Sequence, residues 1–383
     1  MIARRVVAAV TAVGLLVAGC ATPGGGGAAG GAAPSRDAGD LSGVCPATVV
    51  VQLPWTPQAE YGGLYHLVGP DPAIDPARRS VAGALVSAGR DTGVRIELRS
   101  GGPTTGIESV VARMYADPSV MLGEVSTDDA IALSARQPVV AVLAPLDKAP
   151  YMIQWDPRQH PEFHSIADVG MSSTTVSYVG GATYMEVLVG SGVLRRDQVD
   201  GSYDGSPARW LASGGRIAQQ GFATSEPYLY EKILPQWKRR VEFQLIHDAG
   251  YPIYPEALVV RTDRRAEHAA CLKRLVPVIQ RSQVEFVKDP DATIDLIVRA
   301  NEAFGGPTYP AELARYSVAQ QVKLGIVGNG ANTTLGDFAA DRVQKVIDVV
   351  TPAFAGQRRE VKPGLTVADL CTNEFVDASI GLR

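Results

Sequence analysis

The feature that most constrains the fold is a repeated alternation of short apolar runs with amphipathic stretches, which begins at residue 48. Apolar runs cut off by Gly or Pro are typical of buried strands, and apolar residues at spacings of three and four are typical of helices. Expected strands lie at residues 48–53, 94–98, 120–125, 138–143, 174–179, 216–222 and 257–261, and expected helices at residues 80–89, 104–115, 128–136, 183–190, 264–283, 290–301, 310–322 and 337–349. The alternation predicts an α/β fold with largely parallel sheets, which bind ligands beyond the carboxyl ends of their strands.

A polar, proline-rich stretch that runs to residue 161 interrupts the alternation. We expect the chain to leave a first lobe there and to return to it near the strand at 257–261. The predicted arrangement is two doubly wound lobes with a hinged cleft between them. Lobe 1 is expected to comprise residues 44–140 and 260–383, and lobe 2 residues 141–259.

Residues 1–19 have the pattern of a lipoprotein signal peptide, with Arg4 and Arg5 before an apolar run and small residues before Cys20. The run of roughly a dozen apolar residues is shorter than the ~20 that cross a bilayer, so we expect it to be removed and Cys20 to be lipidated. The alternative is cleavage elsewhere, with Cys20 incidental. Residues 20–43, rich in Gly and Ala, predict a flexible tether. The protein is therefore expected outside the cytoplasm, lipid-anchored to the cell membrane.

The charge of the chain bears on its binding partners, and its cysteine content bears on possible disulfides. The formal net charge is −4 and no basic block is present, which disfavours nucleic acid as a partner. Besides Cys20, the chain has Cys45, Cys271 and Cys371. In an oxidising compartment two of these could pair and leave one over, or all three could be separate buried thiols. The sequence does not choose between these arrangements.

Catalytic patterns are weak. The chain has five histidines and lacks both the Gly-x-Ser-x-Gly and the Walker motifs, so any ATPase must be a separate subunit. His160 and His164 have helical spacing, but Pro161 lies between them and no Glu follows His160, which indicates a loop rather than a metal site. We expect no catalytic residue, no metal and no cofactor.

Three motifs, in this order, resemble one family of transport proteins. Residues 53–65 are LPWTPQAEYGGLY, residues 219–228 are QQGFATSEPY, and residues 250–260 are GYPIYPEALVV. They resemble the ABC-transporter substrate-binding proteins for thiamine pyrimidine precursors, riboflavin, nitrate and sulfonates, in which a first strand ends in a Trp-x-Pro turn and Gly-x-Tyr opens the first helix. The match covers about residues 49–283.

The resemblance implies a type II periplasmic-binding-protein fold that closes on a small solute and delivers it, as a monomer, to an ABC permease. A flat heterocycle suits such a cleft, because aromatic faces hold it and a few polar groups orient it. The expected ligand-binding residues are Trp55, Tyr61, Ser100, Gly102, Thr104, Thr183, Tyr184, Glu186, Glu226 and Tyr254. Each has an ordinary alternative: core packing for the aromatics, a plain turn for residues 100–104, and a solvated helix carboxylate for Glu186.

The same family includes fungal enzymes that build the thiamine pyrimidine from pyridoxal phosphate with a lysine, a histidine and a cysteine cluster. This chain has Glu124 and Asp128 where the lysine and histidine would fall, and YPIYP at residues 251–255 where the cysteines would. Without an amine there is no Schiff base, so the resemblance does not extend to the enzymes.

The ligand class follows from charge. Glu60, Glu186 and Glu226 favour a nitrogenous ring with N–H donors, such as a pyrimidine precursor or a flavin, because an unpaired carboxylate that faces an anion is costly. Two alternatives stay open. One is a nitrate or sulfonate importer component, with Arg99 or Arg216 as the cation. The other is a sensory or interaction lipoprotein that carries no solute.

Overall fold

The computed structural model describes residues 39–102 and 109–383. The expected signal peptide, Cys20, nearly all of the tether and Thr104 therefore lie outside the described residues. Within the two described ranges, no helix is both long enough and apolar enough to cross a membrane.

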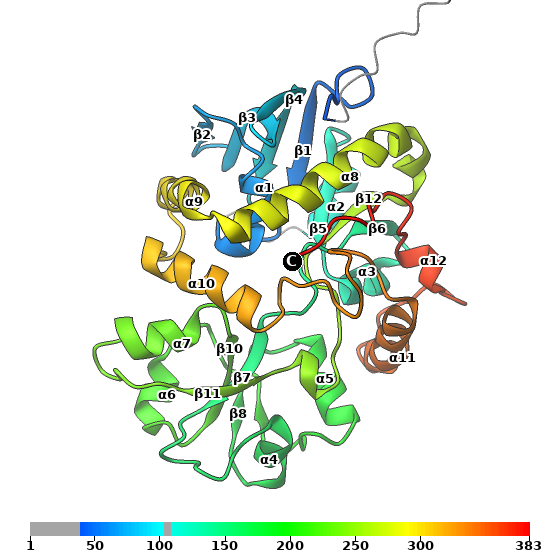
Figure 1. Cartoon of the computed structure of the whole chain (residues 1–383). Coiled ribbons are helices and arrows are strands. Elements are labelled where there is room, and N and C mark those ends of the chain that lie inside the picture. Colours follow the sequence, from blue (N-terminus) through cyan, green and yellow to red (C-terminus); the bar gives the residue numbers. More distant parts are fainter. Residues whose placement is uncertain (1–38, 103–108) are drawn as a thin grey trace, which may run out of the picture. The chain divides into compact units, whose positions relative to one another are not determined.

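The strands form two separate sheets (Figure 1). The seven-stranded sheet has the order β2-β3-β4-β1-β5-β12-β6, and the five-stranded sheet has the order β11-β7-β10-β8-β9. The first sheet consists of β1 (Thr48–Gln52), β2 (Ala73–Asp75), β3 (Ser80–Ser87), β4 (Arg90–Arg99), β5 (Val120–Val125), β6 (Val139–Leu143) and β12 (Ala257–Arg261). The second consists of β7 (Tyr151–Trp155), β8 (Val176–Ser177), β9 (Val199–Asp200), β10 (Ala218–Phe222) and β11 (Glu242–Leu245).

Both sheets are mixed, so the expectation of largely parallel sheets is wrong. In the first sheet β1 runs parallel to β4 and β5, whereas β12 is antiparallel to β5 and β6, and β3 is antiparallel to β4. The antiparallel pairs have two causes: β3 and β4 form a hairpin, and β12 is the strand on which the chain comes back to the first sheet. The carboxyl end of β5 therefore lies beside the start of β12.

Helices cover the sheets. The longest, α8 (Arg265–Lys288), runs across the first sheet (Figure 1) and buries Leu272, Leu275 and Ile279 at the spacing of one helical face. The other helices are α1 (Gly62–Tyr65), α2 (Val110–Ala116), α3 (Thr127–Leu133), α4 (Ile166–Met171), α5 (Thr183–Gly190), α6 (Ala208–Ser213), α7 (Glu226–Tyr228), α9 (Asp291–Ala303), α10 (Ala311–Lys323), α11 (Ala340–Gly356) and α12 (Val367–Leu370).

One predicted element is of the wrong type, and four strands of the described chain correspond to no predicted element. Residues 80–89, predicted as a helix, form β3 and its turn, because Ala88 and Gly89 both adopt positive φ and reverse the chain into β4. The strands without a predicted counterpart are β2, β7, β9 and β11. The chain passes from the first sheet to the second between β6 and β7 and comes back between β11 and β12. The division into lobes at the residue boundaries given above stays a prediction.

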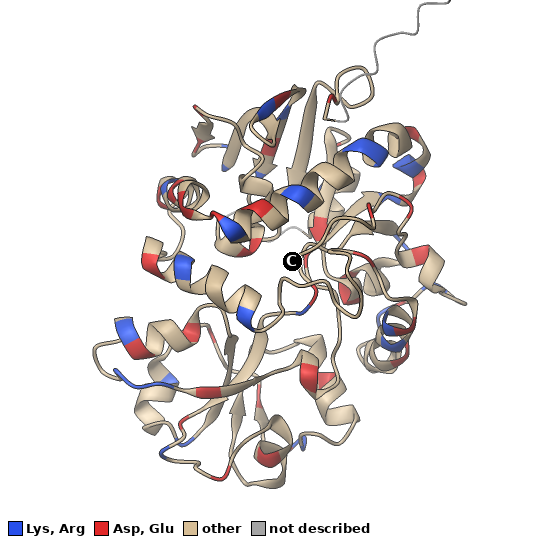
Figure 2. Ribbon diagram, viewed as in Figure 1, with Lys and Arg blue, Asp and Glu red and all other residues tan. Residues whose placement is uncertain are grey.

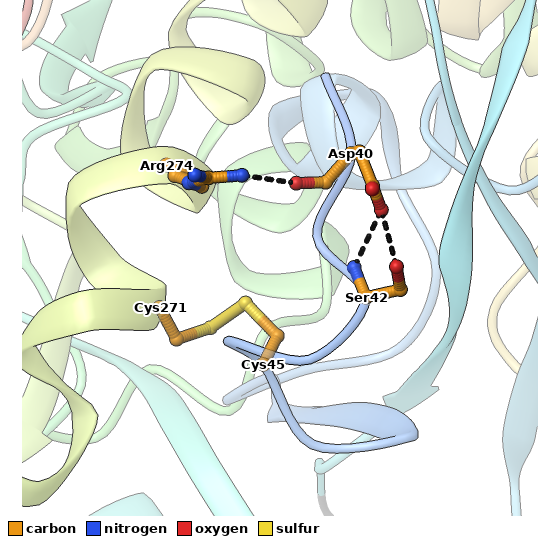
Figure 3. The surroundings of a disulfide bond; sticks show 5 residues. All are labelled: Asp40, Ser42, Cys45, Cys271 and Arg274. Atoms are coloured by element: carbon orange, nitrogen blue, oxygen red, sulfur yellow. Dashed lines mark hydrogen bonds between the residues drawn. A yellow bond between two sulfur atoms is a disulfide. The ribbon is translucent and has the colours of Figure 1, made fainter. Parts of the chain in front are cut away.

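The one cysteine pair in the described residues is Cys45–Cys271 (Figure 3). It links the segment before β1 to α8, and Arg274 on the same helix donates a hydrogen bond of 2.9 Å to the Asp40 carbonyl. Cys371 is a buried free thiol. The disulfide and this hydrogen bond thus fix the first described residues to α8.

Candidate functional site

Two strand-end loops of the first sheet lie side by side. Because β1 and β4 are parallel, their carboxyl ends meet at one edge, and the Gly101 amide donates to the Trp55 carbonyl at 3.1 Å. A Cβ on Gly101 would lie 2.6 Å from the Pro54 carbonyl oxygen, so only glycine permits this approach. Trp55, with 40% of its surface exposed, lies against Gly102. Trp55 and Ser100 to Gly102 are therefore adjacent, as the sequence predicts for one site.

Tyr61 occupies a different position from the one expected. Its ring is 1% exposed and packs in the core under the first sheet, so it presents no open aromatic face. Burial raises the pKa of its hydroxyl far above the ordinary range, and the charges of Glu256 and Glu124 add to the rise. Tyr61 therefore contributes its hydroxyl group, and not its ring, to this region.

Three carboxyl groups meet near that hydroxyl. Glu124 is the penultimate residue of β5, and Glu256 directly precedes β12, where the antiparallel register pairs Leu258 with Glu124. Glu60 lies in the 3₁₀ turn Ala59–Tyr61 and accepts a hydrogen bond of 3.2 Å from the Ser317 hydroxyl. Glu124 and Glu60 are 2% and 6% exposed. We call these three residues the carboxyl cluster.

Electrostatics in the carboxyl cluster oppose ionisation. Burial raises the pKa of Glu256 to about 8, and the charge of Glu60 adds to the rise while the Tyr61 hydroxyl offsets part of it. Burial and then the charge of Glu256 raise the pKa of Glu124 well above its ordinary value. Burial likewise raises the pKa of Glu60. Groups of like charge in a site of low polarity cannot all be ionised at neutral pH.

One aromatic side chain of the second sheet lies within electrostatic range of the carboxyl cluster. Burial raises the pKa of Tyr151 of β7, and the charges of Asp128 and then Glu256 add to the rise. Its ring centroid lies 5.2 Å from that of Phe222 and 6.0 Å from that of Tyr184. Thr224 follows β10, and its hydroxyl lowers the pKa of Glu60 against the larger effect of burial. Residues of both sheets therefore meet at this point.

The expected residues of α5 and its neighbours have other partners. Glu186 forms a two-point ion pair with Arg196, at 2.8 and 2.6 Å, and that hydrogen bonding lowers its pKa, so it behaves as a helix-surface carboxylate. Thr183 is buried at the start of α5, and the Tyr184 hydroxyl donates to Gln220. The Glu226 carboxylate accepts from the Phe222 amide at 2.7 Å and closes its own turn.

Tyr254 belongs to the crossing between the sheets. Its hydroxyl accepts a hydrogen bond of 2.9 Å from the Ala339 amide, its ring packs edge-on against Phe338, and Arg342 lies 3.7 Å over its face. With 2% of its surface exposed, it is packed in the core, which is the alternative given above for the aromatic residues.

Charged side chains of both signs are mixed along the described helices. Figure 2 shows Lys and Arg residues (blue) interspersed with Asp and Glu residues (red) along α8 and α11. Arg99 is bound to Glu97 at 2.8 Å and to Asp117 at 2.7 Å, and Arg216 is exposed. In the part of the chain that the structure describes, no group of three or more His, Cys, Asp or Glu side chains is placed to hold a metal ion.

Comparison with known proteins identifies the fold. No protein-family model and no curated protein matches the sequence. Among solved structures, the ligand-binding component of an ABC-type import system from Staphylococcus aureus, with zinc bound, is 11% identical, with a TM-score of 0.54 over 87% of this chain and 99% of that one. The periplasmic aliphatic sulphonate-binding protein SsuA from Escherichia coli is 14% identical, with a TM-score of 0.53 over 85% and 92% of the two chains. The periplasmic sulfonate-binding protein SsuA from Methylobacillus flagellatus is 13% identical, with a TM-score of 0.54 over 86% and 92%.

The chain has the periplasmic-binding-protein fold. The expected fold class is thereby confirmed, with mixed rather than parallel sheets. At this level of identity the likeness concerns the fold and not the solute.

Proposed function

We propose that this chain is an extracytoplasmic solute-binding lipoprotein that delivers a small aromatic nitrogenous solute, such as a pyrimidine precursor or a flavin-like ring, to an ABC importer. The observation that carries the proposal is the meeting of the carboxyl cluster with Tyr151 of the second sheet, in a fold shared with ligand-binding components of import systems. In this proposal the protein works as a monomer without cofactor or catalytic residue, tethered through Cys20.

The chemistry of the region supports a nitrogenous ring. Aromatic faces bind flat solutes, and carboxyl groups accept hydrogen bonds from ring and exocyclic N–H groups. Trp55 offers an exposed aromatic face on the first-sheet side, and Tyr151 and Phe222 supply rings on the second-sheet side. Ser100, Gly102 and Glu226 stay proposed contacts, whereas Glu186 and Tyr254 have partners that account for them without a ligand.

A sulfonate or nitrate solute is the second candidate, because two of the similar structures are sulfonate-binding proteins. It would place an anion beside buried carboxyl groups, and Arg99 is already held by Glu97 and Asp117. A buried anion needs a partner of opposite charge to offset its desolvation. We therefore favour the nitrogenous ring.

A thermal-shift and titration-calorimetry screen tests the proposal. The probes are an aminopyrimidine, riboflavin, adenine, nitrate and ethanesulfonate. We expect one ring solute to bind at micromolar concentration or tighter and the anions to leave the protein unchanged. Tight binding of ethanesulfonate with no response to rings would select the second candidate, and a wholly flat screen would contradict transport of any of these solutes.

Variants at Trp55 test the aromatic contact. Loss of a ring that stacks on the solute weakens binding by roughly 1–3 kcal/mol, which is about fivefold to 140-fold. We expect Trp55→Ala to show such a loss and Trp55→Phe to retain most of the affinity. Met171→Ala removes another exposed apolar side chain, 78% exposed at the end of α4, and serves as the matched control.

A further inference from the structure

Glu124 and Glu256 are 132 residues apart in the sequence and close together in the fold, Glu124 on β5 and Glu256 directly before β12, the antiparallel neighbour of β5. Within the described residues, Oε2 of each glutamate is buried and has no hydrogen-bond partner. Buried polar atoms of this kind are normally paired, so unpaired ones on separate elements point to a missing ligand.

The groups that act on this pair are all acidic. Glu60 and Tyr61 from the 3₁₀ turn, Tyr65 from α1 and Tyr151 from β7 interact electrostatically with one or both carboxyl groups. No Lys, Arg or His of the described chain is among the groups that shift the pKa of either glutamate. Two neighbouring carboxyl groups without a cation retain a proton between them.

We propose that Glu124 and Glu256 are the binding site for a positively charged nitrogen group of the solute, such as the amidinium edge of an aminopyrimidine ring. In the free protein the two carboxyl groups share a proton, and the cation replaces it. When the solute is a permanent cation, one O–H bond breaks and the proton goes to the solvent. When the solute is a neutral base, the same proton passes from the carboxyl group to the ring nitrogen.

This inference rests on the proposed function and narrows it from nitrogenous rings in general to rings that bind as cations. A flavin, which is neutral at physiological pH, would leave the shared proton in place and would gain no charge–charge attraction. An anion would add a further negative charge to the cluster. The site therefore ranks cationic rings first, neutral rings second and anions last.

Titration calorimetry in two buffers with different ionisation enthalpies tests the site at pH 7. The probes are an N-methylated aminopyrimidinium ion, which is permanently charged, and the matching hydroxypyrimidine, which is neutral. We expect the cation to bind at least about tenfold more tightly, as for a charge-assisted bond in a desolvated site, and to release a proton on binding. Equal affinity for the two probes, or binding of the cation without proton release, would overturn the inference while leaving solute binding intact.

Single-atom variants locate the effect. Glu124→Gln and Glu256→Gln are expected to weaken binding of the cation about tenfold or more and to change the affinity of the neutral ring less than threefold. Glu302→Gln, at an exposed position on α9, is the control and should match the wild type. Equal losses for both probes would show that the variants act on structure and would contradict a charge-specific role.

A measurement without any ligand separates this inference from the function. Infrared difference spectra between pH 6 and pH 10 should contain the C=O band of a protonated carboxyl group that is still present at pH 7 in wild type and is weaker in Glu256→Gln. If no ring binds, the proposed function fails. The charge inference then stands only if this band is present and an alkylammonium ion shifts the melting temperature, and it falls if either is missing.

Discussion

The guanidinium group of Arg342 donates a hydrogen bond of 2.6 Å to Oδ1 of Asp147, which ties α11 to the segment on which the chain leaves the first sheet. The same guanidinium group donates to the carbonyl oxygens of Pro252 at 2.7 Å and Ile253 at 2.8 Å, on the segment where the chain comes back. Arg342 thus holds both crossings between the sheets together. Its side chain and that of Asp147 are 16% and 17% exposed.

Replacement of Arg342 should destabilise the protein and loosen the two crossings. Arg342→Ala leaves Asp147 and two carbonyl groups without their donor, and loss of one partner of a largely buried pair costs about 2–4 kcal/mol. The free energy of unfolding in urea measures this loss. Arg342→Lys keeps the charge but loses the forked geometry and is expected to fall in between.

A control variant and an NMR titration test whether the loss of stability comes from the contacts of Arg342. Arg315→Ala removes an exposed pair with Asp291 and should change stability by at most about 1 kcal/mol. His247 has its pKa lowered to about 4 by burial and by Arg342 and Lys148, so Arg342→Ala should raise the pKa of His247 in an NMR titration. If Arg342→Ala had the Tm of wild type and the pKa of His247 were unchanged, Arg342 would not hold the two crossings together.

The disulfide should contribute more to stability than any single ion pair. Cys45 and Cys271 are separated by 226 residues, and closure of a loop of this size lowers the entropy of the unfolded chain by the equivalent of about 5 kcal/mol. We expect Cys45→Ser or a reductant to lower the free energy of unfolding by a similar amount. Cys371, whose pKa burial raises to about 11, remains a thiol, so Cys371→Ala should keep the full sensitivity to reductant.

The sequence predicts elements well where a pattern is local and poorly where pairing decides. β1, β5, α5 and α10 fall within two residues of the expected bounds at each end. Residues 80–89 are rich in Ala and Gly and have only two β-branched residues, Val81 and Val86, and the pairing with β4 makes them extended. β7 lies directly after prolines, in a stretch whose composition indicates a linker.

The site shows the same limit. Trp55 and Gly102 follow strand ends, and parallel pairing brings such ends together, so a sequence pattern suffices for them. The approach of Glu256 to Glu124 depends on the antiparallel return of β12, which no local pattern indicates. One signal was present: Glu124 is a carboxylate inside the otherwise apolar run at 120–125, where a buried charge needs a reason.

Substitution of Gly101 should separate the two strand-end loops. A Cβ there would lie 2.6 Å from the Pro54 carbonyl and 2.8 Å from the Leu53 carbonyl, so the backbone must move. Gly101→Ala is expected to cost roughly 1–3 kcal/mol of stability, as for an overpacked site, and to weaken ring binding through the displaced Trp55. Gly356→Ala, where nothing lies within 4 Å of the added Cβ, is the control. It should be neutral or slightly stabilising, and equal effects of the two variants would contradict the steric argument.

Stability of the ligand-free protein should rise as the pH falls from 8 toward 5. The pKa of Glu256 is raised to about 8 and that of Glu124 is also raised, whereas both return to about 4.3 on unfolding. Between these values the folded state binds more protons than the unfolded state, so the free energy of unfolding decreases with increasing pH. Urea unfolding at a series of pH values measures the slope. Glu256→Gln should flatten it and raise stability at pH 8 relative to wild type, because a neutral amide carries no charge that must be desolvated. A wild-type profile that is flat between pH 5 and pH 8, or a variant with the same slope, would show that the two carboxyl groups titrate as ordinary glutamates.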